Sequence, residues 1–102
     1  MSLIVLYVTC RNKKEAQKID THLLKKKLIA CTNMFPMKSI YWWKGKLVYE
    51  SEVVLLLKTT KKNSVPVKKE ITKIHSYAIP CILEFQAKAN AAFGRWVEEQ
   101  LS

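Results

Sequence analysis

The chain has 102 residues, of which 49% are hydrophobic and 25% are charged, proportions typical of an ordinary globular protein and not of a disordered one. No apolar run approaches the roughly 18–20 residues that a membrane helix needs, and residues 1–9 lack the basic segment of a signal peptide. The three widely spaced cysteines are typical of reduced thiols. We therefore expect one domain over residues 1–102, in the cytoplasm and without membrane contact.

The charge balance is strongly basic: eighteen Lys and Arg against eight Asp and Glu give a formal net charge of +10. Such a charge can indicate a polyanionic partner. However, only Arg11 and Arg95 carry the guanidinium group that reads base edges and phosphates bidentately. The lysine clusters fall on predicted helix faces, so two interpretations stay open, a solvated surface or a weak affinity for polyanions. We expect no specific binding of nucleic acid.

The first elements are a strand and a helix. Residues 3–10 (LIVLYVTC) are almost continuously apolar and rich in β-branched side chains, which predicts a central strand. Asn12 followed by Glu15 predicts a helix start with a capping box. This helix should end near residues 25–27, where cations suit the negative end of the helix dipole.

A long hairpin is predicted next. Residues 29–43 and 46–60 have the pattern of extended chain, and Lys44 and Gly45 between them form the turn. Residues 53–57 (VVLLL) are typical of a strand that is buried on both faces. Pro36 cannot donate a ladder hydrogen bond, so it marks a bend, a bulge or an edge strand.

The last elements complete a recognisable order. Ser64 is predicted to cap a second helix with Pro66 in its first turn, and residues 81–86 form the last strand. Asn90 caps a third helix, in which Gly94 costs about 1 kcal/mol relative to Ala, so packing must hold that helix. The order predicts an α+β fold, ferredoxin-like βαββαβ, with a long hairpin between its second and third strands and an added C-terminal helix.

The length of the hairpin bears on assembly. An arm of about 15 residues extends roughly 50 Å, whereas a chain of this size has a radius of gyration near 13 Å. The arm must therefore bend back or project, and residues 40–43 (IYWW) lie near its tip. These rings either cover the domain's own core or pack against further copies in a closed homo-oligomer.

No standard catalytic motif is present, so we expect no enzyme. The topology nevertheless brings Cys10, His75 and Cys81 to one edge of the sheet, whereas Cys31 begins the second strand at the opposite edge. Two thiols and an imidazole suit Cu(I) or Zn. The alternative is that the thiols pack as small hydrophobic side chains. Lys58, at the end of an apolar strand, is either an anion anchor or a lysine with only its stem buried.

Five stretches, in order along nearly the whole chain, resemble the CutA divalent-cation tolerance proteins: residues 28–33 (LIACTN), 41–46 (YWWKGK), 52–59 (EVVLLLKT), 75–80 (HSYAIP) and 93–96 (FGRW). Each motif alone is weak, but five in register are specific. The chain departs from the family at Ser76, where the family usually has Pro, and at Ile74, where some bacterial members have a second His.

The resemblance implies a compact homotrimer with a fold like that of the PII signalling proteins, in which long hairpins pair between subunits. It also implies tolerance to copper and other divalent cations, a proposed binding of copper and no assigned enzymatic activity. Carried over by motif, the residues of the intersubunit cleft are Cys31, Asn33, Trp43, Lys58, His75 and Tyr77.

The leading expectation is therefore a trimeric protein of metal homeostasis that binds copper or another divalent cation through His75 and nearby thiols. The alternative is a PII-like sensor that binds a small anionic ligand in the intersubunit cleft, with Lys58 as its anchor. RNA-recognition domains share the βαββαβ order, but residues 53–58 lack the aromatic-Gly-aromatic signature that they need.

Overall fold

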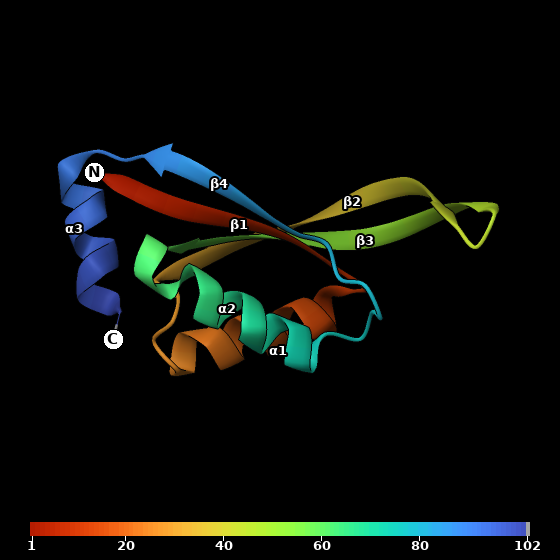
Figure 1. Ribbon diagram of the computed structural model, residues 1–102, viewed down its shortest axis with the longest axis horizontal. Coiled ribbons are helices and arrows are strands. Elements are labelled where there is room, and N and C mark those ends of the chain that lie inside the picture. The colour runs from red at the N-terminus through yellow and green to blue at the C-terminus, as the bar shows by residue number, and fades with distance from the viewer. Residues whose placement is uncertain (102) are drawn as a thin grey trace.

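The computed structural model describes residues 1–101 and confirms the predicted α+β order (Figure 1). Its elements are β1 (Ser2–Cys10), α1 (Lys13–Lys25), β2 (Cys31–Trp43), β3 (Lys46–Thr59), α2 (Lys61–Ile74), β4 (Ile82–Lys88) and α3 (Ala91–Gln100). The four strands form one antiparallel sheet in the order β2-β3-β1-β4. Helices α1 and α2 lie on one face of the sheet, and α3 lies at the end that also holds the N-terminus (Figure 1). No helix within residues 1–101 is long and apolar enough to cross a membrane.

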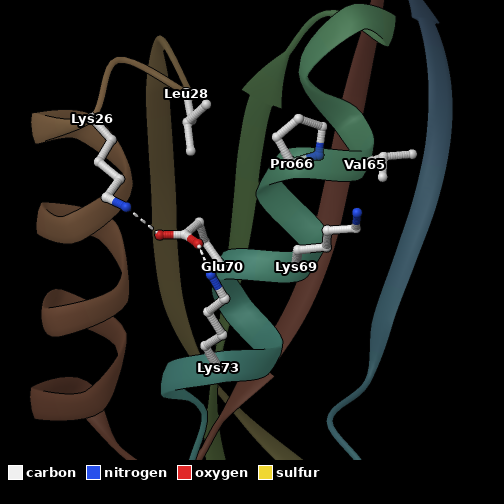
Figure 2. Close-up of a pocket in the computed structure, with 7 residues that line it drawn as sticks. All are labelled: Lys26, Leu28, Val65, Pro66, Lys69, Glu70 and Lys73. Carbon is white, nitrogen blue, oxygen red and sulfur yellow. Dashed lines mark hydrogen bonds and ion pairs between the residues drawn. The ribbon is translucent and has the colours of Figure 1, made fainter.

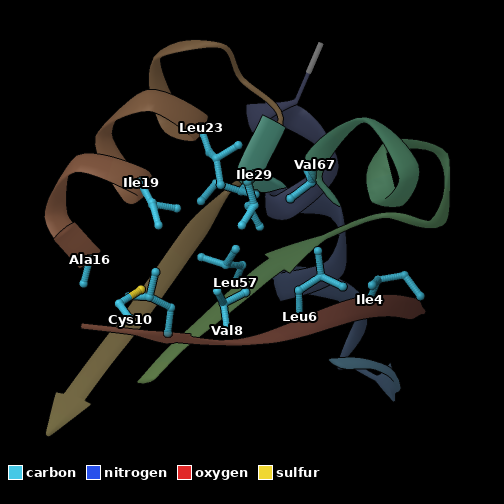
Figure 3. Close-up of a cluster of buried hydrophobic side chains, with 12 residues drawn as sticks. Ile4, Leu6, Val8, Cys10, Ala16, Ile19, Leu23, Ile29, Leu57 and Val67 are labelled. Carbon is cyan, nitrogen blue, oxygen red and sulfur yellow. The ribbon is translucent and has the colours of Figure 1, made fainter. Parts of the chain in front are cut away.

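The core lies between the sheet and the pair α1 and α2 (Figure 3). Because side chains alternate along a strand, every second residue of β1 faces these helices, and Ile4, Leu6, Val8 and Cys10 are at most 3% exposed. The helices add their own buried stripes, which include Ala16, Ile19 and Leu23 on α1 and Val67 and Ile71 on α2. Cys10 ends the row on β1, so its thiol lies at the edge of the core nearest the start of α1.

The β2–β3 hairpin has a continuous register that ends with Trp43 opposite Lys46. Lys44 and Gly45 connect the strands with φ values of 49° and 75°. Two positive φ angles are characteristic of a type I′ turn, whose twist matches that of the two strands. Pro36 lies in β2, an edge strand, where its missing N–H does not interrupt a central ladder.

The hairpin projects beyond the helices, as its length predicts (Figure 1). The molecule measures 45 × 24 × 20 Å, with the hairpin along the longest direction. Ile40, Trp42 and Tyr49 on the projecting arm are 63%, 72% and 70% exposed. The aromatic tip therefore does not cover the core of its own chain.

Two predicted helix starts need correction. The Asn12 side chain accepts from the backbone N–H of Glu15 at 2.9 Å, as predicted, but the Glu15 carboxylate returns to Arg11 and not to Asn12. Helix α2 begins at Lys61, so the prediction that Ser64 caps it was wrong. Ser64 is buried within α2, and its hydroxyl donates to Glu84 on β4.

Helix α3 approaches the N-terminus closely. Its Val97 is fully buried beside Leu3 and Ala30. A Cβ atom added at Gly94 would lie 2.6 Å from the Sδ atom and 2.7 Å from the Cβ atom of Met1. Backbone hydrogen bonds between Met1 and Ala89 hold Met1 in place, so the glycine inside this helix is explained by this contact.

Asp20 is the one carboxylate that α1 turns into the core. It is 5% exposed, and neither of its oxygens has a hydrogen-bond partner within residues 1–101. Burial raises the pKa of Asp20 from 3.8 to about 6, although the nearby Thr32 hydroxyl and Lys58 ammonium lower it. The native state therefore binds a proton at Asp20 more tightly than the unfolded chain does.

We expect Gly94→Ala to lower the free energy of unfolding in a urea titration. The substitution gains about 1 kcal/mol of helix propensity, but relief of the overlap with Met1 must move backbone and costs more. Ala92→Gly, at an exposed position of the same helix, is the control and should lose only propensity. A Gly94→Ala protein more stable than the original would contradict the close approach.

We expect Asp20→Asn to raise the melting temperature at pH 7.5 and to change it little at pH 4. Because the native pKa lies above the unfolded value, the favourable protonation is complete below pH 3.8 and is lost as the pH rises through about 6. Thermal unfolding across this range measures the difference. A melting temperature that falls at pH 7.5 would contradict the account of an unpartnered buried charge.

Candidate functional site

Three potential metal ligands meet at the end of β1. The ligand atoms of Cys10, Glu15 and His75 all lie within 4.8 Å of one another. They come from the last residue of β1, the first turn of α1 and the residue after α2. The structure thus brings Cys10 and His75 together, adds Glu15 and leaves Cys81 outside this group of described residues. We call these three residues the Cys10 cluster.

Both ring nitrogens of His75 have backbone partners. The Tyr77 N–H donates to Nδ1 at 3.0 Å, and Nε2 lies 2.8 Å from the carbonyl oxygen of Thr9. Since a backbone N–H can only donate, Nδ1 is the acceptor and the ring proton of neutral His75 sits on Nε2. The imidazole therefore connects the segment after α2 to the end of β1.

The Glu15 carboxylate makes a second connection to the same segment. One oxygen accepts from the backbone N–H of Arg11 at 2.9 Å, and the other accepts from the backbone N–H of Ser76 at 2.8 Å. Partial burial raises the pKa of Glu15, but the hydrogen bonds from Ser76 and Arg11 outweigh it, and the net pKa lies below the usual value. Glu15 is accordingly ionised at neutral pH.

Cys10 is a protonated thiol at neutral pH. Its side chain is fully buried, and burial raises its pKa to about 12, with further contributions from the carboxylates of Glu15, Asp20 and Glu52. A proton must leave this sulfur before it can bind a cation. The cluster therefore offers sulfur, nitrogen and oxygen donors, but the thiol must give up a proton and the imidazole a hydrogen bond.

A groove of about 780 Å³ lies between the hairpin and the segment before β4, and Cys81 is among its lining residues. On its hairpin side, the Tyr41 hydroxyl donates to Glu50 at 2.6 Å. The Tyr77 hydroxyl donates to Glu52 at 2.7 Å, which fixes the same segment to β3. Burial and the Glu52 hydrogen bond raise the pKa of Tyr77, so this phenol keeps its proton.

The residues expected in a cleft separate into three places, of which the Cys10 cluster with His75 is one. Trp43 and Tyr77 line the groove, whereas Cys31 lies opposite Lys58 near the other end of the hairpin. The Lys58 ammonium donates to the Asn33 side chain and, at 3.2 Å, to a backbone carbonyl of β3. Because its own chain already provides these partners, Lys58 gives no separate support to the expectation of an anion anchor.

Sequence reasoning missed Glu15 as a neighbour of His75. Its position three residues after Asn12 is typical of a capping box, which is a local role. The hydrogen bond from Ser76 to Glu15 spans 61 residues of sequence, so no local sequence pattern could predict it. Only the topology could have indicated this contact, because α1 begins at the same edge of the sheet at which α2 ends, next to His75.

Comparison with known proteins gives a consistent result. The CutA1 divalent ion tolerance protein family matches residues 4–100. The divalent-cation tolerance protein CutA of Archaeoglobus fulgidus is 37% identical over 92% of this chain and 93% of its own, and that of Thermotoga maritima is 34% identical over 97% and 99%. The solved structure of the periplasmic divalent cation tolerance protein CutA from Archaeoglobus fulgidus covers both chains completely, with a TM-score of 0.94 and 35% identity. The chain therefore belongs to the CutA1 divalent ion tolerance protein family.

Proposed function

We propose that this protein acts in divalent-cation tolerance without catalysis, by binding the cation itself at the Cys10 cluster. The observation that supports this proposal is the convergence of three ligand atoms, from three separate elements, within 4.8 Å. A thiolate, an imidazole and a carboxylate together suit Zn(II) or copper better than Mg²⁺ or Ca²⁺. The cation-tolerance names of its relatives agree with such a ligand.

Uptake of a cation exchanges bonds that already exist. One nitrogen of His75 must release Thr9 or Tyr77, whereas each Glu15 oxygen accepts one backbone hydrogen bond and keeps a further lone pair for a cation. If the ring keeps its bond to the Thr9 carbonyl, that carbonyl becomes the outer partner that metal-bound histidines usually have. The bonds that are lost reduce the net affinity, which suits reversible capture of an excess cation.

Assembly forms the second part of the proposal. The sheet face that α1 and α2 leave uncovered carries Phe35, Leu83 and Phe85, which are 44%, 48% and 51% exposed. The projecting arm adds further exposed aromatic side chains. An apolar surface on both the sheet and the arm indicates burial against further copies. We propose the homotrimer that family membership suggests, with the groove at Trp43 and Tyr77 lying between subunits.

We expect the affinity for Zn(II) to rise about tenfold per pH unit between about pH 7.5 and pH 9, because binding displaces one proton from the Cys10 thiol. Glu15 is already ionised in this range and releases none. Competition with a chromophoric chelator, on reduced protein at several pH values, measures this slope. An affinity that does not change with pH would exclude Cys10 as a ligand.

We expect Cys10→Ser and His75→Asn each to weaken binding of Zn(II) or Cu(I) by roughly tenfold or more. Cys31→Ser and Cys81→Ser are matched controls, because each removes one thiol outside the cluster. A loss in Cys81→Ser as large as that in Cys10→Ser would replace this site with the set Cys10, His75 and Cys81.

We expect the double variant Trp42→Ala, Trp43→Ala to dissociate at micromolar concentration in native mass spectrometry. The two rings are 72% and 44% exposed in the single chain, so they gain most from burial against a partner. Lys13→Ala with Lys14→Ala, on the far helix layer, is the control. A tryptophan variant that remains fully trimeric would show that the arm does not hold the assembly.

A further inference from the structure

Most of the positive charge lies on one layer of the molecule, formed by α1 and α2. Of the sixteen lysines, eleven lie in residues 13–27 and 61–74. The same residues include three carboxylates, and none of these is free. Asp20 is buried, Glu15 accepts two backbone hydrogen bonds and Glu70 is ion-paired. The exposed side of this layer therefore has no free carboxylate to offset its lysines.

Five of these lysines form two aligned rows. Lys14, Lys18 and Lys25 follow helical spacing along α1, and Lys62 and Lys69 do so along α2. Each row lies on the side of its helix opposite the buried residues. None of the five ammonium groups makes a hydrogen bond or an ion pair with another residue of 1–101. We call these five residues the lysine face.

Between the two rows, a shallow groove of about 470 Å³ is lined by Lys26, Lys69, Lys73 and Glu70 (Figure 2). Lys26, His22 and Lys73 lie 2.5, 2.9 and 3.1 Å from the carboxylate of Glu70 and lower its pKa to about 2. Lys26 and Lys73 point toward Glu70, whereas Lys69 points away from it (Figure 2). Glu70 thus holds two ammonium groups that would otherwise extend the lysine face.

The side chains of this layer define the partner. Helices α1 and α2 contain no Arg and no Phe, Tyr or Trp, the residues that read guanine edges or stack on bases. Lysine ammonium groups instead bind phosphates as point charges, without regard to sequence. The row from Lys14 to Lys25 is roughly 16 Å long, so it matches an extended chain better than a single phosphate.

We propose that the lysine face binds a linear polyphosphate chain. This binding is separate from cation capture, because the Cys10 cluster contributes no residue to it. Electrostatic attachment of this kind releases counterions, so its affinity falls steeply as salt is added. The acidic partner is recognised by its charge density and its linear form.

The test measures binding of a long-chain inorganic polyphosphate across a series of salt concentrations. The variant Lys25→Gln, Lys62→Gln, Lys69→Gln should lose roughly tenfold or more in affinity, and its log–log salt slope should become shallower by about 2–3. The variant Lys44→Gln, Lys46→Gln, Lys88→Gln removes the same charge from the hairpin and β4 and should keep its affinity. Equal losses in the two variants would show that only net charge matters, and would overturn the proposal.

A further variant is expected to strengthen binding of the polyphosphate and not to weaken it. Glu70→Gln releases Lys26 and Lys73, so it should tighten binding of the polyphosphate severalfold. Cys10→Ser should leave this binding unchanged, which separates a failure here from a failure of the cation site. Absence of binding at about 0.1 M salt, or tighter binding to anionic phospholipid vesicles than to polyphosphate, would contradict the proposed partner.

Discussion

The connection between the end of β1 and the segment after α2 organises one end of this molecule. Three side chains make it: His75 bonds the Thr9 carbonyl, Glu15 accepts from Ser76, and Tyr77 donates to Glu52. Each bond joins elements far apart in sequence, so the segment is held against β1, α1 and β3 at once. The same contacts place an imidazole and a carboxylate beside the buried Cys10 thiol. The contacts that hold this segment in place therefore also assemble the cluster.

The His75 imidazole and the Glu15 carboxylate thus both hold the segment in place and offer donor atoms to a cation. A site assembled only for a metal would leave its donor atoms free, whereas here the imidazole and the carboxylate already have partners and the thiol keeps its proton. A cation bound there would replace the thiol proton and one hydrogen bond of the imidazole, either the one to Thr9 or the one from Tyr77. Tyr77 also lines the groove, so its backbone bond to His75 joins the cluster to the surface that we propose lies between subunits.

Much of the fold could be predicted from the sequence because its signals are local. The apolar run of β1, the turn at Lys44 and Gly45 and the stop of α1 near Lys25 all depend on neighbouring residues. The start of α2 could not be predicted in this way. Asn63 and Ser64 make tertiary bonds, to the Leu28 carbonyl and to Glu84, which turn polar side chains inward and let the helix begin earlier.

The site was predictable only as far as topology allowed. Strand order places Cys10 and His75 at one edge, and the structure brings them together there. Topology does not decide which side chain completes the group, because that depends on which way each one points. Cys81 is close in the strand order but lines the groove, whereas Glu15 reaches the cluster through bonds at both of its carboxylate oxygens.

In the proposed site, Cys10 supplies the sulfur to a bound cation. X-ray absorption of the Zn(II)-loaded protein measures this most directly, because a Zn–S distance of about 2.3 Å is resolved from Zn–N at about 2.0–2.1 Å. We expect one sulfur ligand in the original protein and in Cys81→Ser, and none in Cys10→Ser. Zinc bound only by nitrogen and oxygen in the original protein, or a sulfur ligand that survives in Cys10→Ser, would contradict it.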